Sequence, residues 1–129
     1  MTPLHAAYTF NILVLIPVGL LTLLGGEAGN RRAFQGKFPE SEGTRTILGS
    51  LWTAILVASC LGLIFPVQMS PVLIIQIIYK SLWLLVFVVP RLLSGRSREV
   101  PWGVTVTFLV IVLTYPWIVP WGQLFASEQ

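Results

Sequence analysis

Charged residues are scarce in this 129-residue chain, at 10% of the sequence, against roughly 25% in an ordinary soluble domain. Hydrophobic residues make up 55%, and the mean hydropathy is +0.83. This composition excludes a disordered chain and an ordinary water-soluble globule. Seven of the eight basic residues are divided among short segments between long apolar runs, which disfavours a basic face for nucleic acid. We therefore expect an integral membrane protein with no nucleic-acid partner.

Cysteine and histidine each occur once, as Cys60 and His5. A single cysteine excludes an intrachain disulfide, and one chain alone cannot build a metal site from several His or Cys ligands. Cys60 lies in an apolar run without a His or Asp beside it, so it lacks the base that activates a nucleophile. The sequence predicts neither an enzyme by itself nor a bound metal or cofactor.

Long stretches of the chain lack charge altogether. Residues 1–26 and 100–127 contain no Lys, Arg, Asp or Glu, and residues 46–90 contain only Lys80. A membrane-spanning helix needs about 20 apolar residues, so the middle stretch holds two helices, with a break between Phe65-Pro66 and Ser70-Pro71. We predict one all-α domain, a four-helix up-down bundle whose transmembrane spans lie near 8–26, 47–65, 71–90 and 101–121.

Basic residues gather in two of the predicted connections, at 27–46 and 91–100. With four spans these two loops lie on one side of the membrane, and the segments on the other side contain no Lys or Arg. The positive-inside rule then predicts cytoplasmic loops, with both termini outside; the expected location is the bacterial inner (plasma) membrane. Loop residues of this kind also contact anionic lipid headgroups. The candidates for that contact are Arg31, Arg32, Lys37, Arg45, Arg91, Arg96 and Arg98.

Small residues recur every four positions in the second predicted span. They are Ser50, Ala54, Ala58 and Gly62. Small residues at this spacing let two helix backbones approach closely in a membrane. We expect this row to pack either against the first span, which carries Gly19, or against a second copy of the chain.

Lys80 lies near the middle of the third predicted span, where a lysine costs about 2.5–3.5 kcal/mol to insert. On a helix, Gln76, Tyr79, Lys80 and Trp83 share one stripe, whereas the opposite face is aliphatic. We expect the stripe to face the interior of the bundle. No acidic residue lies in any predicted span to pair with the lysine.

Three interpretations of Lys80 stay open at this point. It is a structural residue that donates to carbonyls and hydroxyls or extends outward to the membrane surface. The acceptors predicted at its depth are Ser59, Cys60, Thr114 and Tyr115, with the backbone carbonyls freed by Pro17 and Pro116. It binds an anionic or carbonyl-bearing, lipid-soluble ligand in a pocket shaped by Gln76, Tyr79 and Trp83. Or it pairs with a carboxylate on another protein. Asn11, nearer the end of the first span, is interpreted as an interfacial polar residue.

The leading prediction for function is a small accessory or structural membrane subunit. It would act through helix packing, in the lipid bilayer, as a homo-oligomer or within a larger membrane complex. One alternative is a small ligand-binding or transport module with its pocket around Lys80. Another alternative is a quinone-linked membrane redox component.

In size and predicted layout, the chain resembles small bacterial membrane proteins of the DoxX-like kind. In the number of spans it is similar to small multidrug transporters. The second resemblance implies an intramembrane glutamate for coupled proton exchange, and the predicted spans contain none. No functional residue is carried over from either family.

Overall fold

The structure, a computed structural model, describes residues 2–126, and every regular element in that range is a helix. Of these described residues 78% are helical, as the predicted all-α class requires. In chain order the elements are α1 (Pro3–Leu24), α2 (Gly26–Ala33), α3 (Glu42–Gly62), α4 (Pro71–Trp83), the π-helix η1 (Leu84–Val88), α5 (Val89–Leu93), the 3-10 helix η2 (Ser97–Glu99), α6 (Trp102–Thr114), the 3-10 helix η3 (Tyr115–Trp117) and α7 (Trp121–Leu124).

Three helical stretches are long and apolar enough to cross a membrane: α1, α3 and the continuous stretch Pro71–Leu93 formed by α4, η1 and α5. The predicted fourth span, 101–121, is continuously helical only over Trp102–Trp117. Proline accounts for the difference, because Pro116 and Pro120 lack the amide hydrogen that the next helical bond needs. The helix therefore tightens into η3 and ends before α7.

Local capping explains where the first two long helices begin. Thr2 precedes Pro3, and its side chain accepts a hydrogen bond of 3.3 Å from the backbone N–H of His5. Ser41 does the same at the start of α3, where it accepts from Thr44 at 3.4 Å. Both helices begin five residues before the spans predicted from hydropathy. Hydropathy misses these starts because the residues that cap a helix are polar and therefore lie outside an apolar run.

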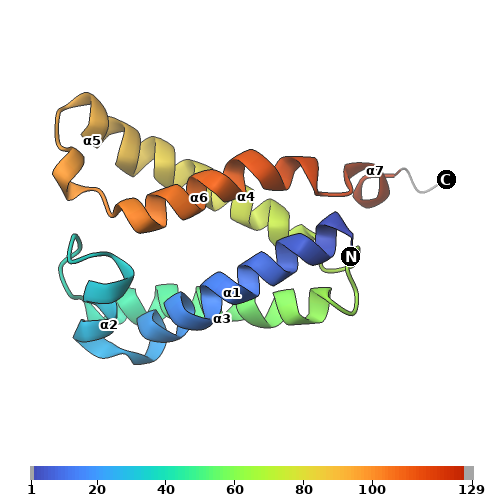
Figure 1. Cartoon of the computed structure of the whole chain (residues 1–129), viewed down its shortest axis with the longest axis horizontal. Coiled ribbons are helices and arrows are strands. Elements are labelled where there is room, and N and C mark those ends of the chain that lie inside the picture. The colour runs from blue at the N-terminus through green and yellow to red at the C-terminus, as the bar shows by residue number, and fades with distance from the viewer. Residues whose placement is uncertain (1, 127–129) are drawn as a thin grey trace.

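The helices form two hairpins that converge at one end of the molecule (Figure 1). One hairpin consists of α1 and α3, with α2 folded against them, and the other consists of the α4–α5 stretch and α6. The start of α1 and the helix α7 lie at the narrow end, whereas α2, α5 and η2 lie at the wide end. Both segments rich in arginine are therefore at the same end of the molecule.

Buried side chains form one apolar cluster at each end. The narrow end is filled by Leu4, Ala7, Tyr8, Leu73, Ile111, Tyr115 and Val119. The wide end is filled by Leu15, Ala33, Phe34, Trp52, Ile55, Val104 and Phe108. Phe34 comes from the segment after α2, so this short helix serves to bring an aromatic side chain between the diverging hairpins.

Glycines set the close contact between α1 and α3. A Cβ atom on Gly49 would lie 2.5 Å from the backbone nitrogen of Leu23, and a Cβ atom on Gly62 would lie 2.7 Å from ring atoms of Tyr8. At Gly19 the same atom would lie 3.7 Å from Cβ of Trp52, which is an ordinary contact. The two helices can pack this closely only because Gly49 and Gly62 have no Cβ atom.

The residues of the predicted small-residue row do not all face α1. Gly62 and Gly19 lie buried in the contact between α1 and α3. Ser50 and Ala54 are exposed on the outer face of α3, and Ala58 is half-buried. The helix turns a different face toward α1 because the aromatic and polar residues Trp52 and Ser59 are the ones that reach the interior.

Candidate functional site

A cavity of about 260 Å³ lies between the two hairpins. Its long walls are one face of α1 and one face of α6, which the helical repeat of three and four residues brings into line. The C-terminal part of α2, Trp52 of α3 and Lys80 of α4 complete it. The lining residues are Asn11, Val14, Leu15, Val18, Leu21, Arg32, Ala33, Gln35, Trp52, Lys80, Gly103, Val104, Thr107, Phe108 and Ile111.

Lys80 is the buried basic residue of this cavity and is only 3% exposed. Its Nζ atom donates to Oε1 of Gln76 at 2.9 Å. The same atom lies 4.8 Å from the centre of the Phe108 ring and 5.3 Å from that of Tyr79. Within residues 2–126 no carboxylate forms an ion pair with it. An ammonium with three donors thus has one oxygen acceptor and two aromatic faces.

The other residues of the predicted stripe do lie near Lys80, and they divide into two roles. Gln76 is fully buried, and its Nε2 atom has no hydrogen-bond partner among the described residues. Tyr79 and Trp83 instead line a second, smaller cavity of about 110 Å³. The Tyr79 hydroxyl accepts from Nε1 of Trp52 at 3.0 Å. The second cavity shares Trp52 with the first.

Aromatic rings separate and support the two cavities. Trp83 stacks on Phe87 with ring centres 5.2 Å apart and planes 10° from parallel. The Phe108 ring makes edge-to-face contacts with Trp52, Tyr79 and Trp83, with ring centres 5.3 to 6.4 Å apart. The π-helix η1 adds to this arrangement, because it carries Phe87 at the start of the wide end. A wider turn of this kind often marks a functional segment.

Polar side chains from three elements meet beside the cavity. Asn11 of α1 is 1% exposed, and its Nδ2 atom donates to Oγ of Ser59 at 3.0 Å. The hydroxyl of Tyr115 donates to Oδ1 of Asn11 and also contacts the carbonyl oxygen of Ala7 at 3.1 Å. The interfacial interpretation of Asn11 is wrong, since this network buries it. Of the four side chains predicted at the depth of Lys80, Ser59 and Tyr115 bind Asn11 instead, and Cys60 and Thr114 are exposed.

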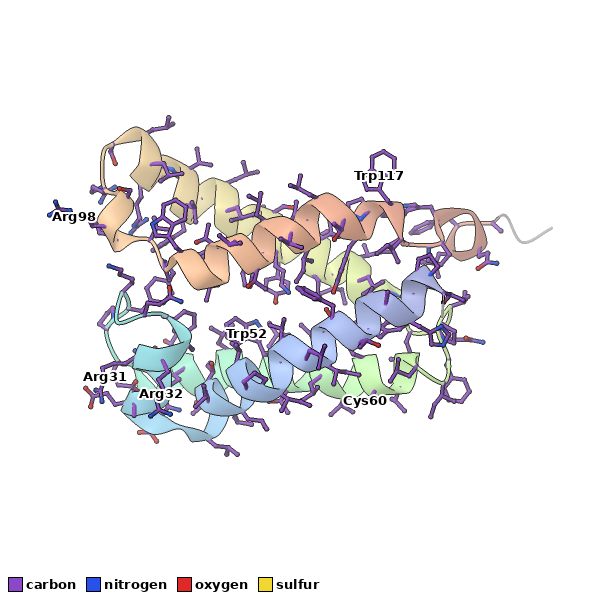
Figure 2. All side chains as sticks on the ribbon, in the orientation of Figure 1. Arg31, Arg32, Trp52, Cys60, Arg98 and Trp117 are labelled. Carbon is purple, nitrogen blue, oxygen red and sulfur yellow. The ribbon has the colours of Figure 1, made fainter. Side chains whose placement is uncertain are left out.

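Arg32 and Gln35 lie where the cavity reaches the wide end (Figure 2, where Arg32 is labelled). Gln35 has a left-handed backbone, with φ of 53°, and is followed by Gly36 with φ of 71°. Oε1 of Gln35 accepts a hydrogen bond of 3.1 Å from the backbone N–H of Gly103. This bond joins the segment after α2 to the first turn of α6. Sequence reasoning placed Arg32 with the lipid-facing residues and did not single out Gln35.

Several of the seven residues predicted to contact lipid headgroups form ion pairs or hydrogen bonds within the chain. Arg45 is held between Glu40, 2.8 Å away, and the last carbonyls of α1, including that of Thr22 at 2.9 Å. Its side chain is only 9% exposed, so we remove it from the candidates for lipid contact. The others in contact with a carboxylate are Arg31 with Glu27, and Arg91 and Arg96 with Glu99.

Arg32, Lys37 and Arg98 form no ion pair within residues 2–126. All three are exposed. Of these, Arg32 alone lines the larger cavity. The part of the chain that the structure describes contains no cluster of three or more His, Cys, Asp or Glu residues. The chain matches no protein-family model, and no similar curated protein or solved structure was found.

Proposed function

We propose that the protein is a four-span membrane protein that binds a small lipid-soluble molecule carrying an anionic or carbonyl group. The membrane is crossed by α1, α3, the α4–α5 stretch and α6 with η3. The wide end, with its arginines, faces the cytoplasm of a bacterial inner membrane, following the positive-inside rule. The fourth span is short, since 16 residues rise about 24 Å against a hydrocarbon core of about 30 Å. Exposed Trp117 at its end suits the interface.

The observation that carries the ligand proposal is the incomplete solvation of Lys80. A buried ammonium needs oxygen acceptors for its three N–H groups, and the surrounding helices provide one, from Gln76. Lys80 and the Phe108 ring, whose centre lies 4.8 Å from Nζ, both line the larger cavity. A carboxylate, phosphate or carbonyl oxygen entering that volume would complete the shell in a medium of low dielectric, where such a bond is strong. A quinone is one carbonyl-bearing molecule of this class.

The proposal is tested on protein purified into lipid nanodiscs. Native mass spectrometry should detect a small-molecule adduct on the wild type, and Lys80→Met should lose it. The matched control is Lys37→Met, which removes an exposed lysine that does not line the cavity. Equal adducts on the wild type and on Lys80→Met would contradict a binding role for Lys80.

A second candidate is the subunit or homo-oligomer predicted from the small residues of α3. It is supported by the exposure of Ser50 and Ala54, which no other helix of the described chain covers. In a Cys60→Ser background, Ala54→Cys should then form a disulfide between two copies in the membrane when an oxidant such as copper phenanthroline is added. Ile78→Cys, on the exposed aliphatic face of α4, is the control that should stay monomeric.

A further inference from the structure

The larger cavity is elongated along the helices. It follows α1 from Asn11 to Leu21 and α6 from Gly103 to Ile111. At 1.5 Å per residue these stretches measure about 15 and 12 Å. A single small polar group at Lys80 would therefore leave most of the length unfilled.

Polar groups stand at both ends of this length, and apolar groups stand between them. One end has Lys80 and Asn11, and the other has Arg32 and Gln35. The walls between the ends are mostly apolar and consist chiefly of Val14, Leu15, Val18, Ala33, Val104 and Phe108. Thr107 is a polar exception, and its hydroxyl donates to the carbonyl oxygen of Gly103 at 2.9 Å.

Both cations of the cavity lack an ion pair within residues 2–126. The neighbouring Arg31, by contrast, lies 3.4 Å from Glu27. The Oε1 atom of Gln35 accepts from the backbone N–H of Gly103, which leaves the amide nitrogen of Gln35 as a further donor. The left-handed backbone of Gln35 is strained and persists only where contacts enforce it. The Gln35 side chain is thus held in place by its hydrogen bond to α6.

We infer that the occupant is an unbranched amphiphile with an oxygen acceptor, such as a carboxylate, at each end. This inference rests on the proposed function. One end binds Lys80, the apolar middle lies between α1 and α6, and the other end binds Arg32 and Gln35. A ligand with one head leaves a hydrocarbon terminus against one of the two cations, whichever way it enters. A ligand with two heads gives both cations an acceptor and matches the apolar walls between them.

Two acids of equal chain length test the inference: dodecanoic acid, with one carboxylate, and dodecanedioic acid, with two. Binding to the protein in phosphatidylcholine nanodiscs is measured by isothermal titration calorimetry. Arg32→Gln should weaken dodecanedioate about tenfold or more, the range for a hydrogen bond to a charged group, and change dodecanoate less than about twofold. Arg98→Gln removes an equally unpaired, exposed arginine outside the cavity and should change neither.

The outcomes separate the inference from the function on which it rests. If Lys80→Met weakens both acids while Arg32→Gln leaves dodecanedioate unchanged, the second anchor is overturned and the Lys80 site stands. If Lys80→Met and Lys80→Gln leave both affinities unchanged, or neither acid binds the wild type, both proposals are overturned. Circular dichroism of each variant identifies any loss of helix that would itself abolish binding.

Discussion

Nζ of Lys80 and Oε1 of Gln76 lie 2.9 Å apart, one helical turn from each other on α4. Gln76 is fully buried, and Nε2 of its amide is unpartnered among the described residues. Gln76 therefore provides one buried hydrogen-bond acceptor for Lys80. We expect the two residues to be coupled, because this hydrogen bond lowers the free-energy cost of burying both side chains.

Gln76→Leu should destabilise the ligand-free protein by about 2 kcal/mol, because it leaves a buried ammonium without its acceptor. Adding Lys80→Met to that variant should recover most of the loss, since an apolar pair of similar volume needs no partner. Thermal unfolding in detergent measures both changes. Gln68→Leu, at an exposed position, serves as the control. A double variant no more stable than Gln76→Leu alone would show that the two residues are independent.

Tyr115→Phe should lower the free energy of unfolding by about 1–3 kcal/mol. The change removes the hydroxyl that joins α1 to η3 through Asn11 and leaves the buried amide oxygen of Asn11 without that donor. Thr114→Val is the matched control, because the hydroxyl of Thr114 is exposed and bonds only to Val110 of its own helix. If both variants lose the same stability, the buried network is not what joins the hairpins.

Gly49→Ala should destabilise the hairpin of α1 and α3 by about 1–3 kcal/mol, the usual cost of overpacking. The added Cβ would lie 2.5 Å from the backbone nitrogen of Leu23, and a backbone atom cannot yield as a flexible side chain can. Gly43→Ala lies on the same helix with nothing within 4 Å of its added Cβ, and it should be neutral or slightly stabilising. Resistance to unfolding in sodium dodecyl sulfate compares the two. Equal resistance would contradict the close backbone contact.

Cysteine labelling tests the proposed four spans and their orientation. In a Cys60→Ser background, Lys37→Cys and Arg96→Cys should react with a membrane-impermeant maleimide only from the cytoplasmic side. Gln68→Cys, in the turn between α3 and α4, should react only from the opposite side. Labelling of positions 37 and 96 from opposite sides would require an odd number of crossings between them and would overturn the four-span topology.

Hydropathy predicts the helical class and four spans, three of which correspond to helices long and apolar enough to cross a membrane. Long uncharged runs carry that information because lipid leaves a spanning chain few alternatives to a helix. The predicted fourth span is too long because the apolar run continues through Pro116 and Pro120, whereas the continuous helix does not. A proline changes hydropathy little, yet it removes a backbone donor, and here it ends the continuous helix.

The candidate site was predicted only in part. The stripe of Lys80, Gln76, Tyr79 and Trp83 follows from the helical repeat, and these side chains do lie at or beside the cavities. Residues contributed by other helices could not be placed. Asn11 gave one usable signal, a polar amide within an otherwise apolar run. Gln35 gave none, because its position depends on a bond to Gly103, 68 residues away in sequence.

The two hairpins diverge from the end where the chain begins toward the end that carries α2 and α5 (Figure 1). In a bilayer, a body of this outline displaces more lipid from one leaflet than from the other. Such asymmetry would couple the protein to membrane curvature. A membrane rich in this protein would curve, with the leaflet that holds the arginine segments on the convex side.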